Sequence, residues 1–199
     1  MKKIETVWHH ILVERVTEQR FQWTQQALAR RFGYSLSTIH HALRVPTEVG
    51  AIRKTGKAFV LHDVKKLLYY WASVRNLSRD VLYATTTDAP IREIEALALP
   101  GSLYGAYSAA RRLLGEPPAD YSTVYFYIAP QELAAFRRRF PPVSRPPVNT
   151  VALKMPPTLP SYGPTTTLVQ AFVDCWNLAD WYAREFTRVL EERIDALLS

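Results

Sequence analysis

The sequence predicts an α+β protein with two domains, one over residues 1–62 and one over residues 63–199. One observation behind this prediction is that apolar residues with helical spacing alternate irregularly with β-prone runs. A second is composition, since 48% hydrophobic and 12% aromatic residues are enough for a packed core. The third is charge: residues 1–62 hold 10 Lys or Arg and 4 Asp or Glu, whereas residues 63–199 hold 15 and 14. The positive excess on the first domain indicates a polyanionic partner for that domain.

Three helices are expected in the first domain. Val7, Ile11, Leu12 and Val16 recur at helical spacing within residues 3–20. Thr24 is a good N-cap for a second helix over residues 25–32, and Gly33 suits the positive φ at its end. Ser35 then caps a third helix that runs to Arg44. The residues expected to point inward from this third helix are Leu36, Ile39, Ala42 and Leu43.

The outward face of the third helix is polar and cationic, and a basic hairpin follows it. Two short strands are expected around Thr55-Gly56, within residues 51–63. This order of parts resembles the winged helix-turn-helix DNA-binding domains of bacterial and archaeal transcription regulators, over about residues 3–62. The resemblance implies contact with double-stranded DNA, although helix-turn-helix patterns also serve in protein contacts. The candidate DNA-binding residues are Ser35, Ser37, Thr38, His40, His41, Arg44, Arg53, Lys54 and Lys57.

The second domain is expected to mix strands and helices. Strands are predicted over residues 81–87, 121–128 and 148–155. Helices are predicted over residues 64–77, 91–99, 103–114, 131–139, 167–177 and 181–198. Asp63 and Ser102 are the expected caps of the first and third of these helices. The last helix carries an apolar stripe longer than a small sheet needs, which predicts a homodimer; the stripe consists of Tyr182, Phe186, Leu190, Ile194 and Leu197.

Three blocks of the second domain carry a further resemblance. They are residues 101–128, which include GSLYGAYSAARRLLG, the β-prone run VNTVALKM at 148–155, and TTTLVQAFVDCWNLADWYAREF at 165–186. In this order behind a winged helix they resemble the AbiEi-type family of antitoxins and transcription regulators. The resemblance implies a repressor that binds operator DNA and regulates its own operon. It also implies a possible nucleotidyltransferase toxin as partner.

Two other classes of function remain open alternatives. Gly101-Ser102 is similar to the Gly-Ser that opens nucleotidyltransferase sites, but no pair of carboxylates two residues apart follows it to hold Mg²⁺. Glu93 and Glu95 have that spacing, but on a helix they point apart. No enzymatic activity is therefore expected. A small-molecule sensor is the other alternative, with aromatic residues lining a pocket; they are Tyr69, Tyr70, Trp71, Tyr121, Tyr125, Tyr127, Trp176 and Trp181.

The remaining expectations concern compartment and cofactors. The single cysteine, Cys175, lies in an apolar run, which predicts a buried structural thiol and no internal disulfide. No apolar segment is long enough for a leader or a membrane span, so a cytoplasmic location is expected. Adjacent histidines at 9–10 and 40–41 cannot chelate as pairs, because neighbours on a helix diverge by about 100°. No metal site and no cofactor are expected.

Overall fold

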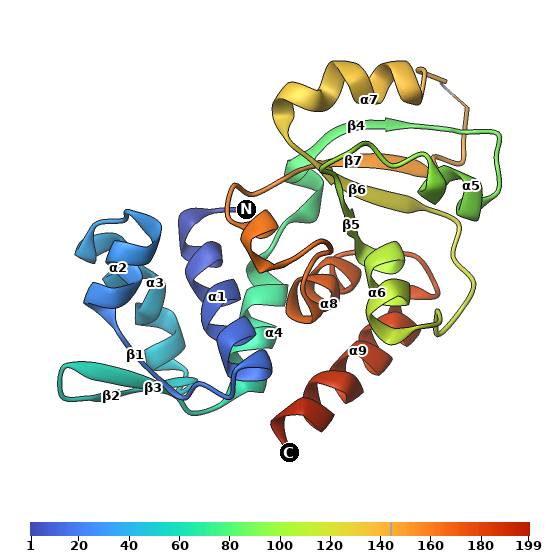
Figure 1. The fold of residues 1–199 in the computed structure, drawn as a ribbon. Coiled ribbons are helices and arrows are strands. Elements are labelled where there is room, and N and C mark those ends of the chain that lie inside the picture. Colours follow the sequence, from blue (N-terminus) through green and yellow to red (C-terminus); the bar gives the residue numbers. More distant parts are fainter. Residues whose placement is uncertain (144) are drawn as a thin grey trace. The chain divides into compact units, whose positions relative to one another are not determined.

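The computed structural model describes residues 1–143 and 145–199 of the chain (Figure 1). Its fold is mixed α+β with two small sheets, which confirms the predicted class. The chain divides into two compact units: unit 1 comprises residues 1–75 and 193–199, and unit 2 comprises residues 76–192. In the part of the chain that the structure describes, no helix is both long enough and apolar enough to cross a membrane.

Unit 1 combines helices with a three-stranded sheet. Its elements are α1 (Lys3–Thr17), β1 (Gln22–Thr24), α2 (Gln25–Phe32), α3 (Leu36–Glu48), β2 (Ile52–Thr55), β3 (Ala58–Leu61), α4 (Val64–Val74) and the last residues of α9 (Ala183–Leu198). The strand order is β1-β3-β2 and both pairings are antiparallel. The sequence did not predict β1, a three-residue strand in which Trp23 pairs with Phe59 and stacks on its ring at 6.0 Å.

Local capping explains where α2 and α3 begin. The Thr24 hydroxyl accepts a hydrogen bond from the Ala27 backbone N–H at 3.1 Å, and the Ser35 hydroxyl accepts one from the Thr38 N–H at 3.2 Å. Between the two helices Gly33 has φ of 63°, a conformation that favours glycine. These caps and this turn are confirmed as predicted.

Buried polar groups hold α1 in place within unit 1. The Glu14 carboxylate accepts hydrogen bonds from the Trp23 indole at 2.6 Å and from Arg20 at 2.9 Å. The Glu5 carboxylate accepts from the Trp71 indole on α4 and from Arg75, both at 3.2 Å. These contacts tie α4 to α1, so unit 1 extends to residue 75. The expected boundary at 62/63 assigned α4 to the second domain and therefore differs from the observed division.

Two buried histidines on α1 predict a pH-dependent stability. Burial lowers the pKa of His9 to about 3, with His10 and Arg75 adding to the effect. Burial also lowers the pKa of His10 to about 4, although Glu14 at 3.1 Å opposes the shift. Both groups are neutral in the folded chain and take up protons near pH 6.5 once unfolded. Their stabilising contribution is therefore present above pH 6.5 and is lost as the pH falls toward 4.

We expect the unfolding equilibrium constant to rise between pH 7 and pH 5 by on the order of tenfold for each of these histidines. Urea unfolding of the full chain at the two pH values measures this change. A His9→Gln variant should show a weaker pH dependence, whereas His40→Gln, at an exposed position, should keep that of the parent. Equal stability of the parent chain at both pH values would contradict the interpretation.

Unit 2 is built on a four-stranded mixed sheet with helices on both faces. Its elements, besides three short 3-10 turns among the described residues, are β4 (Val81–Thr85), α5 (Ile91–Ala96), β5 (Leu103–Gly105), α6 (Ala106–Leu114), β6 (Val124–Ile128), α7 (Leu133–Arg139), β7 (Thr150–Lys154), α8 (Leu168–Trp176) and the first part of α9. The order is β4-β7-β6-β5; β6 and β7 are parallel and the other pairs antiparallel.

The sheet has a core on each face. Ile94 from α5 and Phe136 from α7 pack with Phe126 and other side chains of one face. On the opposite face Tyr127 and Leu153 form a second core, and Figure 1 shows α6 and α8 on that side, with α7 on the other. Polar contacts are buried within this fold as well: the Glu95 carboxylate pairs with Arg111 of α6 at 2.5 Å.

The structure corrects the helix predicted from residue 103. Residues 103–105 form β5, and the helix begins at Ala106. Ser102 does not cap it, because its hydroxyl donates to the Leu99 carbonyl at 2.7 Å. Strand pairing overrides the helical spacing here: Gly105 lies against the Tyr127 ring so closely that a Cβ would stand 3.0 Å from a ring carbon.

Candidate nucleic-acid interface

The exposed face of α3 carries most of the candidate residues. Ser37, His40, His41 and Arg44 are exposed, as predicted. The opposite face, with Ile39, Ala42, Leu43 and Pro46, is buried. The helix is fixed from behind, since the Trp8 indole N–H donates to the Ala42 carbonyl at 2.6 Å. A buried apolar face and a fixed backbone leave a polar face of defined orientation.

The first turn of α3 differs in part from the prediction. Leu36, expected to point inward, is 51% exposed. The Ser35 and Thr38 hydroxyls lie 2.9 Å apart and share a hydrogen bond, and Thr38 is half-buried. Leu36 points outward because it immediately follows the cap, ahead of the first turn that packs on the core. Ser35 and Thr38 thus shape the start of the helix, and Thr38 offers less free surface than the sequence predicts.

The hairpin places its three cations on different faces. Arg53, Lys54 and Lys57 are exposed, and none has an ion-pair partner within residues 1–143 and 145–199. Successive residues of a strand point to opposite faces, so Lys54 shares the face of Ile52 while Arg53 lies on the other. Lys54 consequently faces α3 across a hollow, and Arg53 does not line it.

Two adjoining hollows of about 190 and 220 Å³ lie between α3 and the hairpin. Gln25, Leu43, Thr47 and Lys54 line both of them. His40 and Arg44 line the first, and Lys57 lines the second. The structure therefore brings His40, Arg44, Lys54 and Lys57 together at one surface. Sequence reasoning missed Gln25, Thr47 and Glu48, which join this surface only because the hairpin folds back beside α3.

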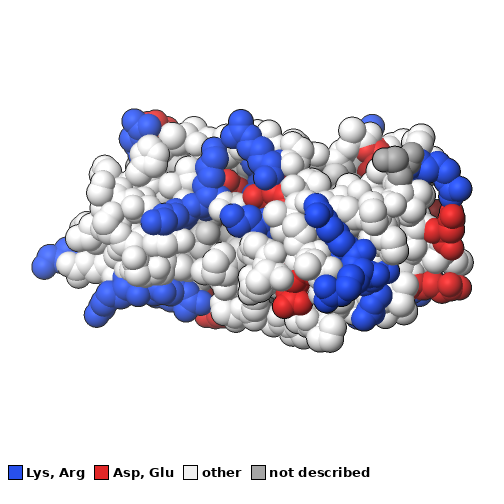
Figure 2. Space-filling model, turned by 90° about the horizontal axis from the view of Figure 1, so that it is seen from above, with Lys and Arg blue, Asp and Glu red and all other residues white. Residues whose placement is uncertain are grey.

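Charge separates the two units. Unit 1 holds 14 Lys or Arg and 6 Asp or Glu, and unit 2 holds 11 and 12. Basic side chains are not confined to unit 1, since Figure 2 also shows them over α7, where Arg137, Arg138 and Arg139 are exposed. In the last turn of α7 the three side chains suit the negative end of the helix dipole. These three arginines carry the same charge as the three hairpin cations and lie on unit 2, so they provide a matched control for variants of the hairpin.

The geometry around Gly101-Ser102 bears on the nucleotidyltransferase alternative. Glu132 is the carboxylate among the residues lining the adjacent hollow of about 200 Å³. Glu93 is exposed while Glu95 is 2% exposed, so the two carboxylates point apart as expected for neighbours on a helix. Glu95 is committed to Arg111 and to the Tyr121 hydroxyl, each at 2.5 Å. The Glu95 bonds stabilise the fold of unit 2.

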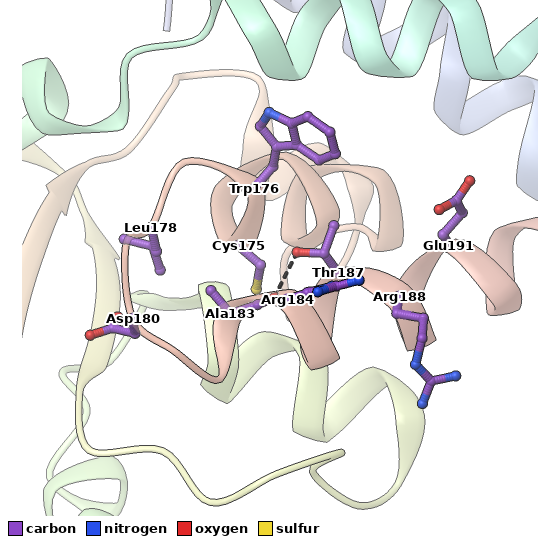
Figure 3. Close-up of a pocket in the computed structure, with 9 residues that line it drawn as sticks. All are labelled: Cys175, Trp176, Leu178, Asp180, Ala183, Arg184, Thr187, Arg188 and Glu191. Atoms are coloured by element: carbon purple, nitrogen blue, oxygen red, sulfur yellow. Dashed lines mark hydrogen bonds between the residues drawn. The ribbon is translucent and has the colours of Figure 1, made fainter.

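The aromatic residues suggested for a sensor pocket are scattered. Tyr69, Tyr70 and Trp71 belong to α4 in unit 1, and Tyr121, Tyr125 and Tyr127 lie in or beside the core of unit 2. Trp176 and Trp181 are 45% and 82% exposed. Of this set, only Trp176 lines the groove of about 410 Å³ that follows the end of α8 and the first turns of α9 (Figure 3).

Two further predictions for unit 2 concern the burial of Cys175 and of the apolar stripe of the last helix. Cys175 is fully buried as expected, and burial, with the neighbouring Asp174 and Asp180 carboxylates, raises its pKa. Four residues of the predicted apolar stripe are also buried within the chain: Tyr182, Phe186, Leu190 and Ile194 are at most 4% exposed, whereas Leu197 is half-buried. This stripe does not provide the spare apolar surface on which the homodimer prediction rested. The assembly state itself stays a prediction.

Comparisons of the chain with models of protein families, with curated proteins and with solved structures give no match.

Proposed function

We propose that unit 1 is a winged helix-turn-helix domain that binds double-stranded DNA sequence-specifically. The observation that carries this proposal is the surface formed by the exposed face of α3 and the hairpin, where Arg44, Lys54 and Lys57 border shared hollows without carboxylate partners among the described residues. A helix of 13 residues with a polar outer face fits the major groove of B-DNA.

The two parts of this surface have different roles in the proposal. Ser37, His40 and His41 on the exposed face of α3 present donors and acceptors to base edges. Arg44 and the hairpin cations contact phosphates or the minor groove. In this proposal a phosphate of the DNA backbone lies at the hollows between α3 and β2, between the helix and the wing. Base contacts specify the site and phosphate contacts position the protein.

Variants of α3 and variants of the hairpin should impair DNA binding in different ways. We expect His41→Ala to cost about 1–3 kcal/mol on the cognate duplex and little on a scrambled one. Lys57→Gln should weaken binding to both duplexes and reduce the slope of log K against log salt by about one. Fluorescence anisotropy over a salt series measures both, with the duplex taken from the chain's own promoter.

Lys154→Gln removes the same charge from an exposed position of unit 2 and serves as the matched control. It should leave the salt slope unchanged. If His41→Ala and Lys57→Gln bind as the parent does at low salt, the helix-turn-helix serves protein contacts and the proposal is wrong.

We further propose that the chain acts as a repressor of the AbiEi type, with an antitoxin role toward a nucleotidyltransferase toxin. The support is the resemblance of residues 101–128, 148–155 and 165–186 to the AbiEi-type family, together with the DNA-binding proposal for unit 1. A reporter fused to the chain's own promoter should be repressed when the chain is expressed, and Lys54→Gln/Lys57→Gln should relieve the repression. Repression that the double variant leaves intact would contradict this role.

A further inference from the structure

The groove along α8 and α9 has the size of a small-molecule site. Its volume of about 410 Å³ falls within the roughly 300–1,000 Å³ of ligand pockets. Its lining includes the apolar side chains of Leu178 and Ala183 and the half-exposed indole of Trp176, with Thr187 next to Cys175 (Figure 3). Aliphatic side chains and an indole suit the apolar or aromatic body of a ligand.

Four charged residues line the groove, the cations Arg184 and Arg188 and the anions Asp180 and Glu191. Arg188 is neutralised by Glu185 at 2.9 Å and by Glu192 at 2.5 Å. The Asp180 carboxylate accepts a hydrogen bond from the Tyr107 hydroxyl at 2.8 Å. Figure 3 shows the charged ends of Arg188 and Asp180 pointing away from Trp176. Arg184 also lines the groove, is exposed, and has no ion-pair partner in the part of the chain that the structure describes.

We propose that this groove binds a small aromatic or apolar carboxylate. The indole of Trp176 covers the body of the ligand, and the guanidinium of Arg184 binds the carboxylate. A guanidinium binds a carboxylate through two parallel hydrogen bonds, which adds orientation to the charge attraction. The groove thereby selects an anion with an apolar body over a neutral molecule of the same shape.

The ligand would regulate unit 1 through α9. Arg184 and Thr187, which line the groove, lie in the first turns of this helix, whose residues from Arg193 onward belong to unit 1. There Asp195 pairs with Lys65 at 2.8 Å, and Gln19 donates to the Leu197 carbonyl. A ligand that favours one position of α9 changes the energy of these contacts and so couples to unit 1. This regulatory step rests on the proposed DNA-binding function; the binding site does not.

Calorimetric titration of the full chain tests the site, with 1-naphthoate as the probe and uncharged 1-naphthalenemethanol as its analogue. We expect naphthoate to bind with a Kd below about 1 mM, and Arg184→Gln to weaken it by on the order of tenfold. The alcohol should bind more weakly than naphthoate does, and it should bind the parent chain and Arg184→Gln with equal affinity. Arg193→Gln is the matched control, because it removes the same charge from an exposed position of α9 outside the groove lining, and it should bind naphthoate as the parent does. Absence of naphthoate binding, or equal weakening by both variants, would overturn the proposal.

Duplex binding measured with and without saturating naphthoate tests the coupling. The affinity of the parent chain for duplex should change about fivefold or more, and that of Arg184→Gln should not. Naphthoate binding with unchanged duplex affinity would refute the regulation and keep the site. A parent chain that binds naphthoate but no duplex would refute the DNA-binding function instead.

Discussion

Replacing Arg53, Lys54 and Lys57 together by glutamine is expected to weaken duplex binding on the order of 100-fold at 0.15 M salt. Each phosphate contact contributes about 0.9 to the slope of log K against log salt. Three lost contacts therefore lower the slope by about 2.7, which between 1 M and 0.15 M salt amounts to roughly 100-fold in affinity. All three side chains are exposed and lack carboxylate partners among the described residues, so their loss should leave the fold intact. Anisotropy titrations at several salt concentrations measure both the affinity and the slope.

The arginines of α7 provide the matched control for this triple variant. Replacing Arg137, Arg138 and Arg139 by glutamine removes the same charge from exposed positions of unit 2. If binding depends on the hairpin, the α7 variant should stay close to the parent. Equal losses in the two triple variants would show that net charge, and not the α3 and hairpin surface, drives binding.

Arg111→Met is expected to have the largest effect on stability, a loss of about 3 kcal/mol in the free energy of unfolding. Its partner Glu95 has a side chain that is 3% exposed, and the variant leaves this carboxylate buried with only neutral hydrogen-bond donors. Breaking one side of a buried pair costs about 3–5 kcal/mol, and the 17% exposure of the Arg111 side chain places the expected loss at the lower end.

A second substitution separates the unpaired charge from simple loss of packing. Glu95→Leu in the Arg111→Met background should recover much of the stability, because an apolar pair replaces the ionic one. Arg188→Met, which breaks exposed pairs with Glu185 and Glu192, should change little. Urea unfolding of the three variants and the parent gives the comparison. A loss no larger for Arg111→Met than for Arg188→Met would contradict the account.

Local chemistry explains which features of the fold could be predicted. The caps at Thr24, Ser35 and Asp63 depend on a hydroxyl or carboxylate three residues from the N–H it receives, so the sequence contains the whole motif. The start of β5 depends instead on Gly105 fitting against Tyr127, twenty-two residues away. Helical spacing alone therefore gave the wrong element there. The sequence did not predict β1 for the same reason, because Trp23 becomes part of a strand only by pairing with Phe59.

The same distinction between local and long-range features applies to the candidate site. The polar face of α3 and the basic hairpin were readable from periodicity and turn residues, and the structure confirms the exposure of His40, His41 and Arg44. The role of Lys54 beside α3, and the separation of Arg53 from it, depend on how β2 pairs with β3. The groove near Trp176 depends on where the first turns of α9 lie relative to the end of α8, which no local pattern specifies.

Whether α3 and the hairpin bind DNA is tested most directly by titrating the full isotope-labelled chain with its promoter duplex and recording the shifts of the backbone amides in NMR spectra. We expect the largest shifts on residues 36–44 of α3 and 53–57 of the hairpin, and we expect them to diminish as salt is raised. Shifts confined to other parts of the chain, or none at low salt, would contradict the assignment of α3 and the hairpin as the DNA-binding surface.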